Sequence, residues 1–202
     1  MDVLSSVGVL LGSSWASGIN LYMTVAGLGI AQRMHWINLP GEMNVLGNPL
    51  IILVAAAMYV VEFVADKIPL FDSVWDSVHT FIRPVGAAAL GYMATSNIGP
   101  AAQIPVALVS GAVSLDAHLT KATSRVAVNS TIPLGVNSVV SLGEDAFVLG
   151  VLYLIIKHPV IAAISVILFI IFSIWFLIMM FKFLKKVLRF IFRSGEKPYQ
   201  PA

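Results

Sequence analysis

The sequence predicts an all-α protein, a bundle of membrane-spanning helices, and three observations lead to this fold class. Apolar residues make up 58% of the 202-residue chain and charged residues only 11%, whereas about a quarter of the residues in soluble domains are charged. The segment 159–181 has no charged residue, and about 20 such residues in a helix cross a hydrocarbon core of roughly 30 Å. Polar breaks interrupt two other apolar segments. We therefore expect a single integral membrane domain over residues 1–202.

The apolar segments lie in order along the chain at about 3–32, 48–66, 84–121, 124–156 and 159–181. Small and polar residues interrupt the first between Gly12 and Asn20, and the fourth between Asn129 and Asn137. Backbone that is not helical persists at membrane depth only where protein or a wet cavity satisfies its amide groups. These two segments are therefore predicted to be discontinuous or re-entrant helices.

The two breaks are similar in sequence. Ser13–Asn20 aligns without gaps to Ser130–Asn137, with three identical positions. Gly-interrupted apolar segments in two halves of a chain are typical of transporters built from inverted repeats, with the site at the repeat interface. Close helix packing in membranes also favours small residues. Inverted repeat halves at 1–99 and 100–184 are thus one interpretation, and helix packing alone is the other.

Basic residues follow the last apolar segment. Positive charge beside a span is retained on the cytoplasmic side of a membrane, so residues 182–202 are predicted to form a basic cytoplasmic tail. At helical spacing these residues would contact anionic lipids as membrane partners of the chain. They are Lys182, Lys185, Lys186, Arg189 and Arg193.

Glu62 and Asp66 are the first candidate site residues. If the helix starts near Asn48, Glu62 follows after roughly 21 Å at 1.5 Å per residue, which places it inside the membrane. Two acids four residues apart share one helix face. A carboxylate in the membrane core is usually functional or paired. The alternative is a later helix start, with both acids at the interface and Lys67 as their partner.

The stretch between Pro69 and Pro84 predicts an amphipathic helix bounded by the two prolines. Four polar residues fall within an arc of about 60° on its polar face, and they are Asp72, Asp76, His79 and Arg83. This face either lies on the membrane surface or lines an internal cavity, where His79 beside carboxylates would titrate near neutral pH. The Asp76 and His79 spacing by itself does not define a metal site, so no metal is predicted.

Glu144 and Asp145 form a further acidic pair in an apolar helix. Adjacent helical residues point about 100° apart, so at most one is expected to face a given cavity squarely. Lys121 and Arg125, four residues apart, are interpreted as marking a solvated helix end. Catalytic motifs and cysteines are absent, and the basic run flanks a membrane helix, so we expect neither an enzyme, nor a cofactor, nor nucleic-acid binding.

Three sequence blocks resemble the bacterial membrane family called domain of unknown function 4126. They are Ser17–Tyr22, Glu62–Pro69 and Asp72–Pro84, and the resemblance covers nearly the whole chain. It implies a location in the bacterial inner membrane and one common fold, and it supplies no substrate. It also implies that the Glu62 to Arg83 block is the signature of the family.

Three functional hypotheses follow. The leading one is a small transporter or channel-like carrier for an ion or solute, with proton or cation coupling. A homo-oligomer is compatible with this hypothesis. The second is binding or translocation of a phosphorylated lipid through Arg83, Lys121 and Arg125. The third is a structural or assembly subunit with internally paired charges such as Asp76 and Arg83. The candidate site residues are Asn20, Glu62, Asp66, Asp72, Asp76, His79, Arg83, Asn137, Glu144 and Asp145.

Overall fold

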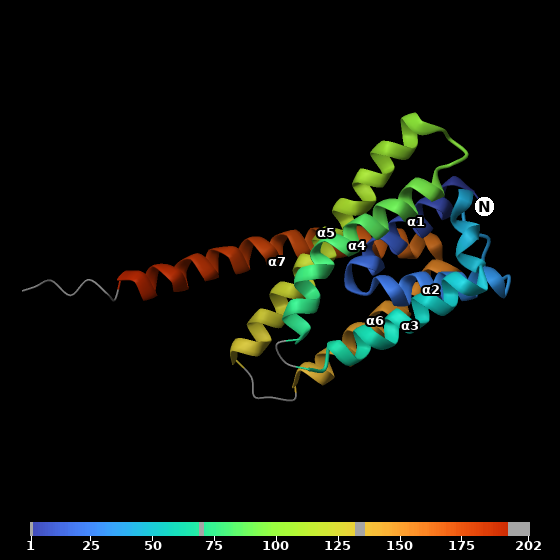
Figure 1. The fold of residues 1–202 in the computed structure, drawn as a ribbon. Coiled ribbons are helices and arrows are strands. Elements are labelled where there is room, and N and C mark those ends of the chain that lie inside the picture. The colour runs from blue at the N-terminus through green and yellow to red at the C-terminus, as the bar shows by residue number, and fades with distance from the viewer. Residues whose placement is uncertain (1, 69–70, 132–135, 194–202) are drawn as a thin grey trace, which may run out of the picture.

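The computed structural model describes residues 2–68, 71–131 and 136–193, and every regular element in these ranges is a helix (Figure 1). The predicted all-α class is confirmed. The elements are α1 (Val3–Ile19), α2 (Leu21–Arg33), the 3-10 helix η1 (Gly41–Gly47), α3 (Pro49–Ala65), α4 (Phe71–Ala94), α5 (Pro100–Thr131), α6 (Val136–Lys157) and α7 (Pro159–Arg193).

The first predicted break is present, and it is confined to Asn20. Helix α1 continues through Gly12 and Gly18 and ends at Ile19, and α2 starts at Leu21. Figure 1 shows the chain turning back at this point. Asn20 has extended backbone angles (φ −149°, ψ 97°) and only 1% exposure, so the break lies inside the protein, as the need to satisfy its amide groups requires.

The second predicted break separates two long helices. Helix α5 has 32 residues and ends at Thr131, and α6 has 22 residues and starts at Val136. Residues 132–135 lie outside the described part of the chain, as does the side chain of Asn137. The proposed inverted repeat therefore stays a prediction.

Pro84 does not end the amphipathic helix, so that boundary was predicted wrongly. Helix α4 continues through Pro84 to Ala94, and α5 starts at Pro100. The apolar segment expected at 84–121 is thus divided between two helices. Proline removes one backbone hydrogen bond, and neighbouring helices can compensate for this loss in a membrane protein.

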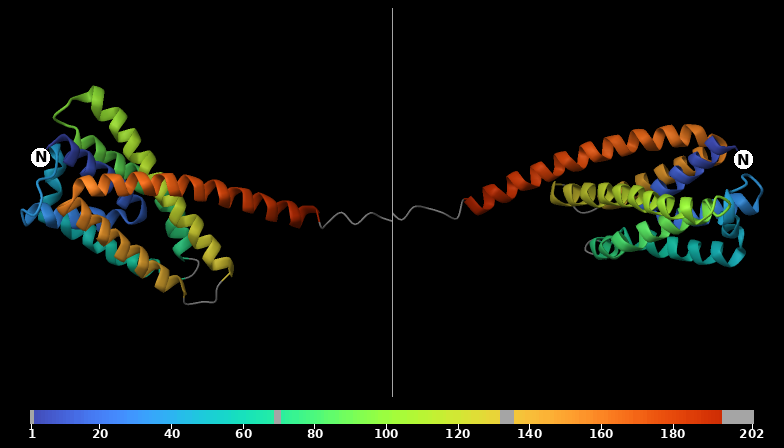
Figure 2. Two further views of the ribbon diagram at one scale, coloured as in Figure 1. Left: turned by 180° about the vertical axis from the view of Figure 1, so that it is seen from behind. Right: turned by 90° about the horizontal axis from the view of Figure 1, so that it is seen from above.

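Three helical segments are long and apolar enough to cross a membrane: Pro100–Val126, Ser138–Lys157 and Pro159–Phe183. A fourth candidate is the pair η1 and α3, which is bent by 73°. These helices support membrane association. With 35 residues, α7 is longer than the roughly 20 residues that a bilayer core requires, and Figure 2 shows its C-terminal part extending beyond the other helices.

Helix α1 lies at the centre of the bundle and contacts α4, α5, α6 and α7. Small residues make this position possible, because Ser13, Ser14 and Ser17 are completely buried and small side chains let helix backbones approach closely in membrane bundles. The end of α1 and the break at Asn20 are thereby held among the other helices.

Candidate functional site

Arg83 on α4 is a fully buried cation that joins three other parts of the chain. Its Nη2 donates to Glu62 Oε1 on α3 at 2.6 Å, and its Nη1 donates to the carbonyl oxygen of Gly18 at 3.1 Å. The same Nη1 donates to Nδ1 of His118 on α5 at 2.7 Å. Asp76 lies on the same face of α4 as Arg83, and its Oδ1 is 3.5 Å from Nη2 of Arg83. The pairing of Asp76 with Arg83 that was inferred from the sequence is therefore present.

Lys121 and Arg125 on α5 bring together carboxylates from different helices. Arg125 contacts Asp66 at 2.7 Å, Glu144 at 2.7 Å and Asp76 at 3.4 Å. Lys121 contacts Asp66 and Glu144, each at 3.3 Å. The two basic residues do not mark a solvated helix end, because each is at most 6% exposed. That interpretation was wrong.

The C-terminal end of α1 is stabilised by the same cations. The last carbonyl groups of a helix lack partners within the helix, and the helix dipole places partial negative charge there. The carbonyl oxygen of Gly18 accepts from Arg83, and that of Ile19 accepts from Lys121 Nζ at 2.9 Å. The helix break inside the bundle is thus satisfied by two positive side chains.

Asn20 completes the break on the side of α2. Its Oδ1 accepts from the backbone N–H of Met23 at 2.9 Å, a helix N-cap. Its Nδ2 donates to Oδ1 of Asp145 at 3.2 Å, and the hydroxyl of Tyr59 donates to Oδ2 of Asp145 at 3.3 Å. Asp145 is 8% exposed, and among the described residues it forms no ion pair with a lysine or an arginine.

Glu144 and Asp145 are both directed into the protein but toward different partners, in agreement with the expectation that at most one of them faces a given cavity squarely. Glu144 contacts Arg125 and Lys121, whereas Asp145 contacts Asn20 and Tyr59. The two side chains point in different directions, as helix geometry requires. Partners from other helices lie in both directions.

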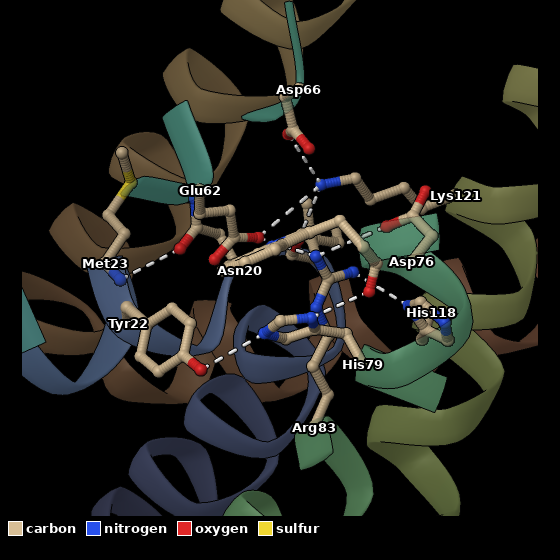
Figure 3. A network of polar contacts seen from close by, with 12 residues as sticks. Asn20, Tyr22, Met23, Glu62, Asp66, Asp76, His79, Arg83, His118 and Lys121 are labelled. Atoms are coloured by element: carbon tan, nitrogen blue, oxygen red, sulfur yellow. Dashed lines mark hydrogen bonds and ion pairs between the residues drawn. The ribbon is translucent and has the colours of Figure 1, made fainter. Parts of the chain in front are cut away.

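His79 lies at the edge of this network and not between carboxylates (Figure 3). Its Nδ1 is 2.8 Å from the carbonyl oxygen of Trp75, so Nδ1 carries the hydrogen. Its Nε2 is 3.1 Å from the hydroxyl of Tyr22 and accepts from it. This arrangement fits a neutral imidazole. The expectation of a histidine paired directly with two acids is not supported by these contacts.

These buried ion pairs and hydrogen bonds form one network, whose residues come from α2, α3, α4, α5 and α6 and from Asn20 and Asp66 at helix ends. Figure 3 shows Glu62, Asp66, Asp76 and Arg83 turned toward one another, with Lys121 reaching in from α5. Asp66 follows α3 directly. Burial by itself raises the pKa of the Asp66 carboxyl, but the hydrogen bond from Arg125 and the charges of Lys121 and Arg125 outweigh burial and lower the pKa. Asp66 is therefore ionised at neutral pH.

A small polar cavity of about 190 Å³ lies against this network between α4 and α5. Asp72, Asp76 and Arg125 line it, and Asp72 is only 2% exposed. The polar face of α4 therefore points into the protein, not toward the membrane surface. Among the described residues, no group of three or more carboxylate or histidine side chains has a geometry that could hold a metal ion.

Sequence reasoning left five members of the network off the list of site residues: Tyr22, Tyr59, His118, Lys121 and Arg125. The spacing of Lys121 and Arg125 was a usable signal, because four residues on a helix place both on one face. Their place along an apolar segment was the second signal. Tyr22 and Tyr59 carried no pattern that separates them from ordinary membrane aromatics.

The fold and the site define a class of protein: a polytopic α-helical membrane protein with a buried network of ion pairs around a helix break. The chain belongs to the family described as "Domain of unknown function (DUF4126)", whose model matches residues 7–179. The family resemblance drawn from the sequence is confirmed. The search of curated proteins found no match, and the search of solved structures found none either.

Proposed function

We propose that this protein is a small membrane carrier that couples movement of an ion or solute to proton binding by its buried carboxylates. One observation carries the proposal. Five carboxylates face three cations in the network, and they still outnumber the cations when Lys67, whose charge interacts with Asp145 and Asp66, is counted as a fourth. The acids are Glu62, Asp66, Asp76, Glu144 and Asp145, and the cations are Arg83, Lys121 and Arg125.

An excess of buried negative charge favours uptake of protons or other cations. Burial disfavours an ionised carboxyl group unless a positive charge or hydrogen bonds compensate. Asp145 is the best candidate for the proton acceptor, because its two partners, Asn20 and Tyr59, are neutral. Glu62 is the second candidate, since its Oε2 is buried without a hydrogen-bond partner. Both residues lie in candidate membrane-crossing segments.

Replacement of Asp145 with asparagine is expected to abolish most proton binding. Asparagine keeps an acceptor oxygen for one neighbour and leaves no cation unpaired, so the fold is expected to persist. We would adsorb proteoliposomes to a solid-supported membrane, apply a pH step and record the transient charge displacement. The wild type is expected to give a transient that empty liposomes lack, and D145N is expected to lose most of it. This readout requires no knowledge of the solute.

Glu42→Gln is the matched control, because Glu42 is an exposed carboxylate on η1, away from the network. The control is expected to keep the wild-type transient. Equal transients in D145N and the wild type would remove Asp145 as proton acceptor. A wild-type signal no larger than that of empty liposomes would contradict proton coupling altogether.

The structural-subunit hypothesis remains the second candidate, because every cation of the network is paired with at least one carboxylate. It predicts no transient in any variant. The phosphorylated-lipid hypothesis receives less support. Arg83 is 0% exposed and bound to Glu62, so this guanidinium is not presented to a head group.

A further inference from the structure

A second and larger cavity, of about 490 Å³, lies between α1, α5, α6 and α7. Its volume is within the range of about 300–1,000 Å³ that small-molecule sites occupy. The residues that matter for its chemistry are Trp15, Lys121, Glu144, Phe147, Phe169 and Phe172. The cavity is thus aromatic over much of its wall and reaches the charged network through two side chains.

The aromatic rings form a continuous wall. The rings of Trp15 and Phe169 are stacked with centroids 4.9 Å apart, and Phe147 lies edge-on to Trp15 at 5.5 Å. Phe147 and Phe172 are 42% and 56% exposed on the outside of the bundle. Because α6 and α7 contain candidate membrane-crossing segments, we expect this open side of the cavity to face lipid. A ligand dissolved in the bilayer can reach it from the side.

The charge next to the cavity favours a positive ligand. Glu144 has the most exposed side chain of the ion-paired acids, at 15%. Lys121 also lines the cavity, but its ammonium group is already held by Asp66, Glu144 and the carbonyl oxygen of Ile19. Glu144 in turn is paired with Arg125 and Lys121, so a ligand cation would share this carboxylate with them. Carboxylates also outnumber cations in the network behind these side chains. Aromatic ring faces attract cations as well, most strongly that of tryptophan.

A further carboxylate lies behind the cavity wall. Asp116 on α5 accepts a hydrogen bond from Ser173 on α7, and Ser173 lines the cavity. Among the described residues, Asp116 has no ion pair with a lysine or an arginine. When it is ionised, it would add to the negative potential on this side of the bundle.

We propose that this cavity binds a lipophilic organic cation, a molecule with an apolar body and one positive charge, which arrives from the bilayer. The apolar body would lie against the aromatic wall and the charge would face Glu144. The role of this ligand as a solute exchanged for protons rests on the proposed function, whereas its binding does not.

Tetraphenylphosphonium and tetraphenylborate provide the sharpest test, because they share size and shape and differ in the sign of the charge. We would place the protein in nanodiscs of zwitterionic lipid and measure binding of each ion by equilibrium dialysis, with empty nanodiscs subtracted. Saturable binding of tetraphenylphosphonium, at least 10-fold tighter than that of tetraphenylborate, is the expected result. No saturable binding of the cation, or equal or tighter binding of the anion, would overturn the proposal.

Phe172→Ala tests the location, because it removes an aromatic ring at the mouth of the cavity without touching the network. Affinity for tetraphenylphosphonium is expected to fall roughly 2- to 30-fold, the range of a cation–π contact. Phe181→Ala is the matched control, since Phe181 lies on the same helix, is 64% exposed and does not line the cavity. Equal affinities in the two variants would overturn the assignment to this cavity.

The two proposals can fail separately. Loss of the pH-step transient in D145N together with no tetraphenylphosphonium binding would leave proton coupling standing and remove the ligand class. Binding of tetraphenylphosphonium with no transient in the wild type would leave the cation site standing and remove proton coupling.

Discussion

Replacement of Arg83 with alanine is expected to destabilise the protein by roughly 3 to 5 kcal/mol, the range for breaking a buried ion pair. Arg83 is completely buried and donates to Glu62 and to the carbonyl oxygen of Gly18. Its loss would leave the buried Glu62 carboxylate with less positive charge beside it. It would also remove the hydrogen-bond donor to the carbonyl oxygen of Gly18 at the end of α1. Thermal unfolding in detergent, followed by loss of the helical circular dichroism signal, measures the effect.

Arg33→Ala is the control for this experiment, because Arg33 is exposed at the end of α2. It is expected to unfold within a few degrees of the wild type. The double variant R83A with Glu62→Gln is expected to recover part of the loss, since it removes the uncompensated charge. If R83A were no less stable than R33A, Arg83 would not be central to the network.

Replacement of Gly18 with alanine has the second-largest expected effect. A Cβ at this position would lie 2.2 Å from the carbonyl oxygen of Ser114 and 2.9 Å from its carbonyl carbon. Both atoms belong to the backbone of α5, so no side-chain rotation can relieve the overlap. Helix α1 would have to move away from α5, at a free-energy cost of about 3 kcal/mol, the upper end of the usual overpacking range.

The same movement would weaken the bonds from Arg83 and Lys121 to the end of α1, so G18A is expected to lower the pH-step transient as well as the unfolding temperature. Gly150→Ala is its control, because no atom lies within 4 Å of a Cβ at that position of α6. In a helix interior this change is expected to stabilise by about 0.5 to 1 kcal/mol. Equal unfolding temperatures for the two variants would contradict the close packing of α1 on α5.

Composition and hydropathy determined the membrane class and most of the helices, because these depend on local properties of the chain. The last apolar segment became α7, and the helix break lies at Asn20, the end of the cluster of small residues, which itself stays helical. The polar face of α4 was also readable, since residues three and four apart share one side of a helix. Pro84 was misleading, because its effect depends on which helices surround it.

The sequence by itself therefore determined which residues are polar in an apolar environment, and the tertiary structure decided what each of them contacts. Asn20 and Asp145 are 125 positions apart in the chain and are hydrogen-bonded in the structure. Helical periodicity specifies only a face, and the partner of that face depends on how the helices pack. For the same reason Lys121 and Arg125 were predicted at a solvated end and lie at the centre of the network. Their charges are held inside only because α3, α4 and α6 bring carboxylates to the same place.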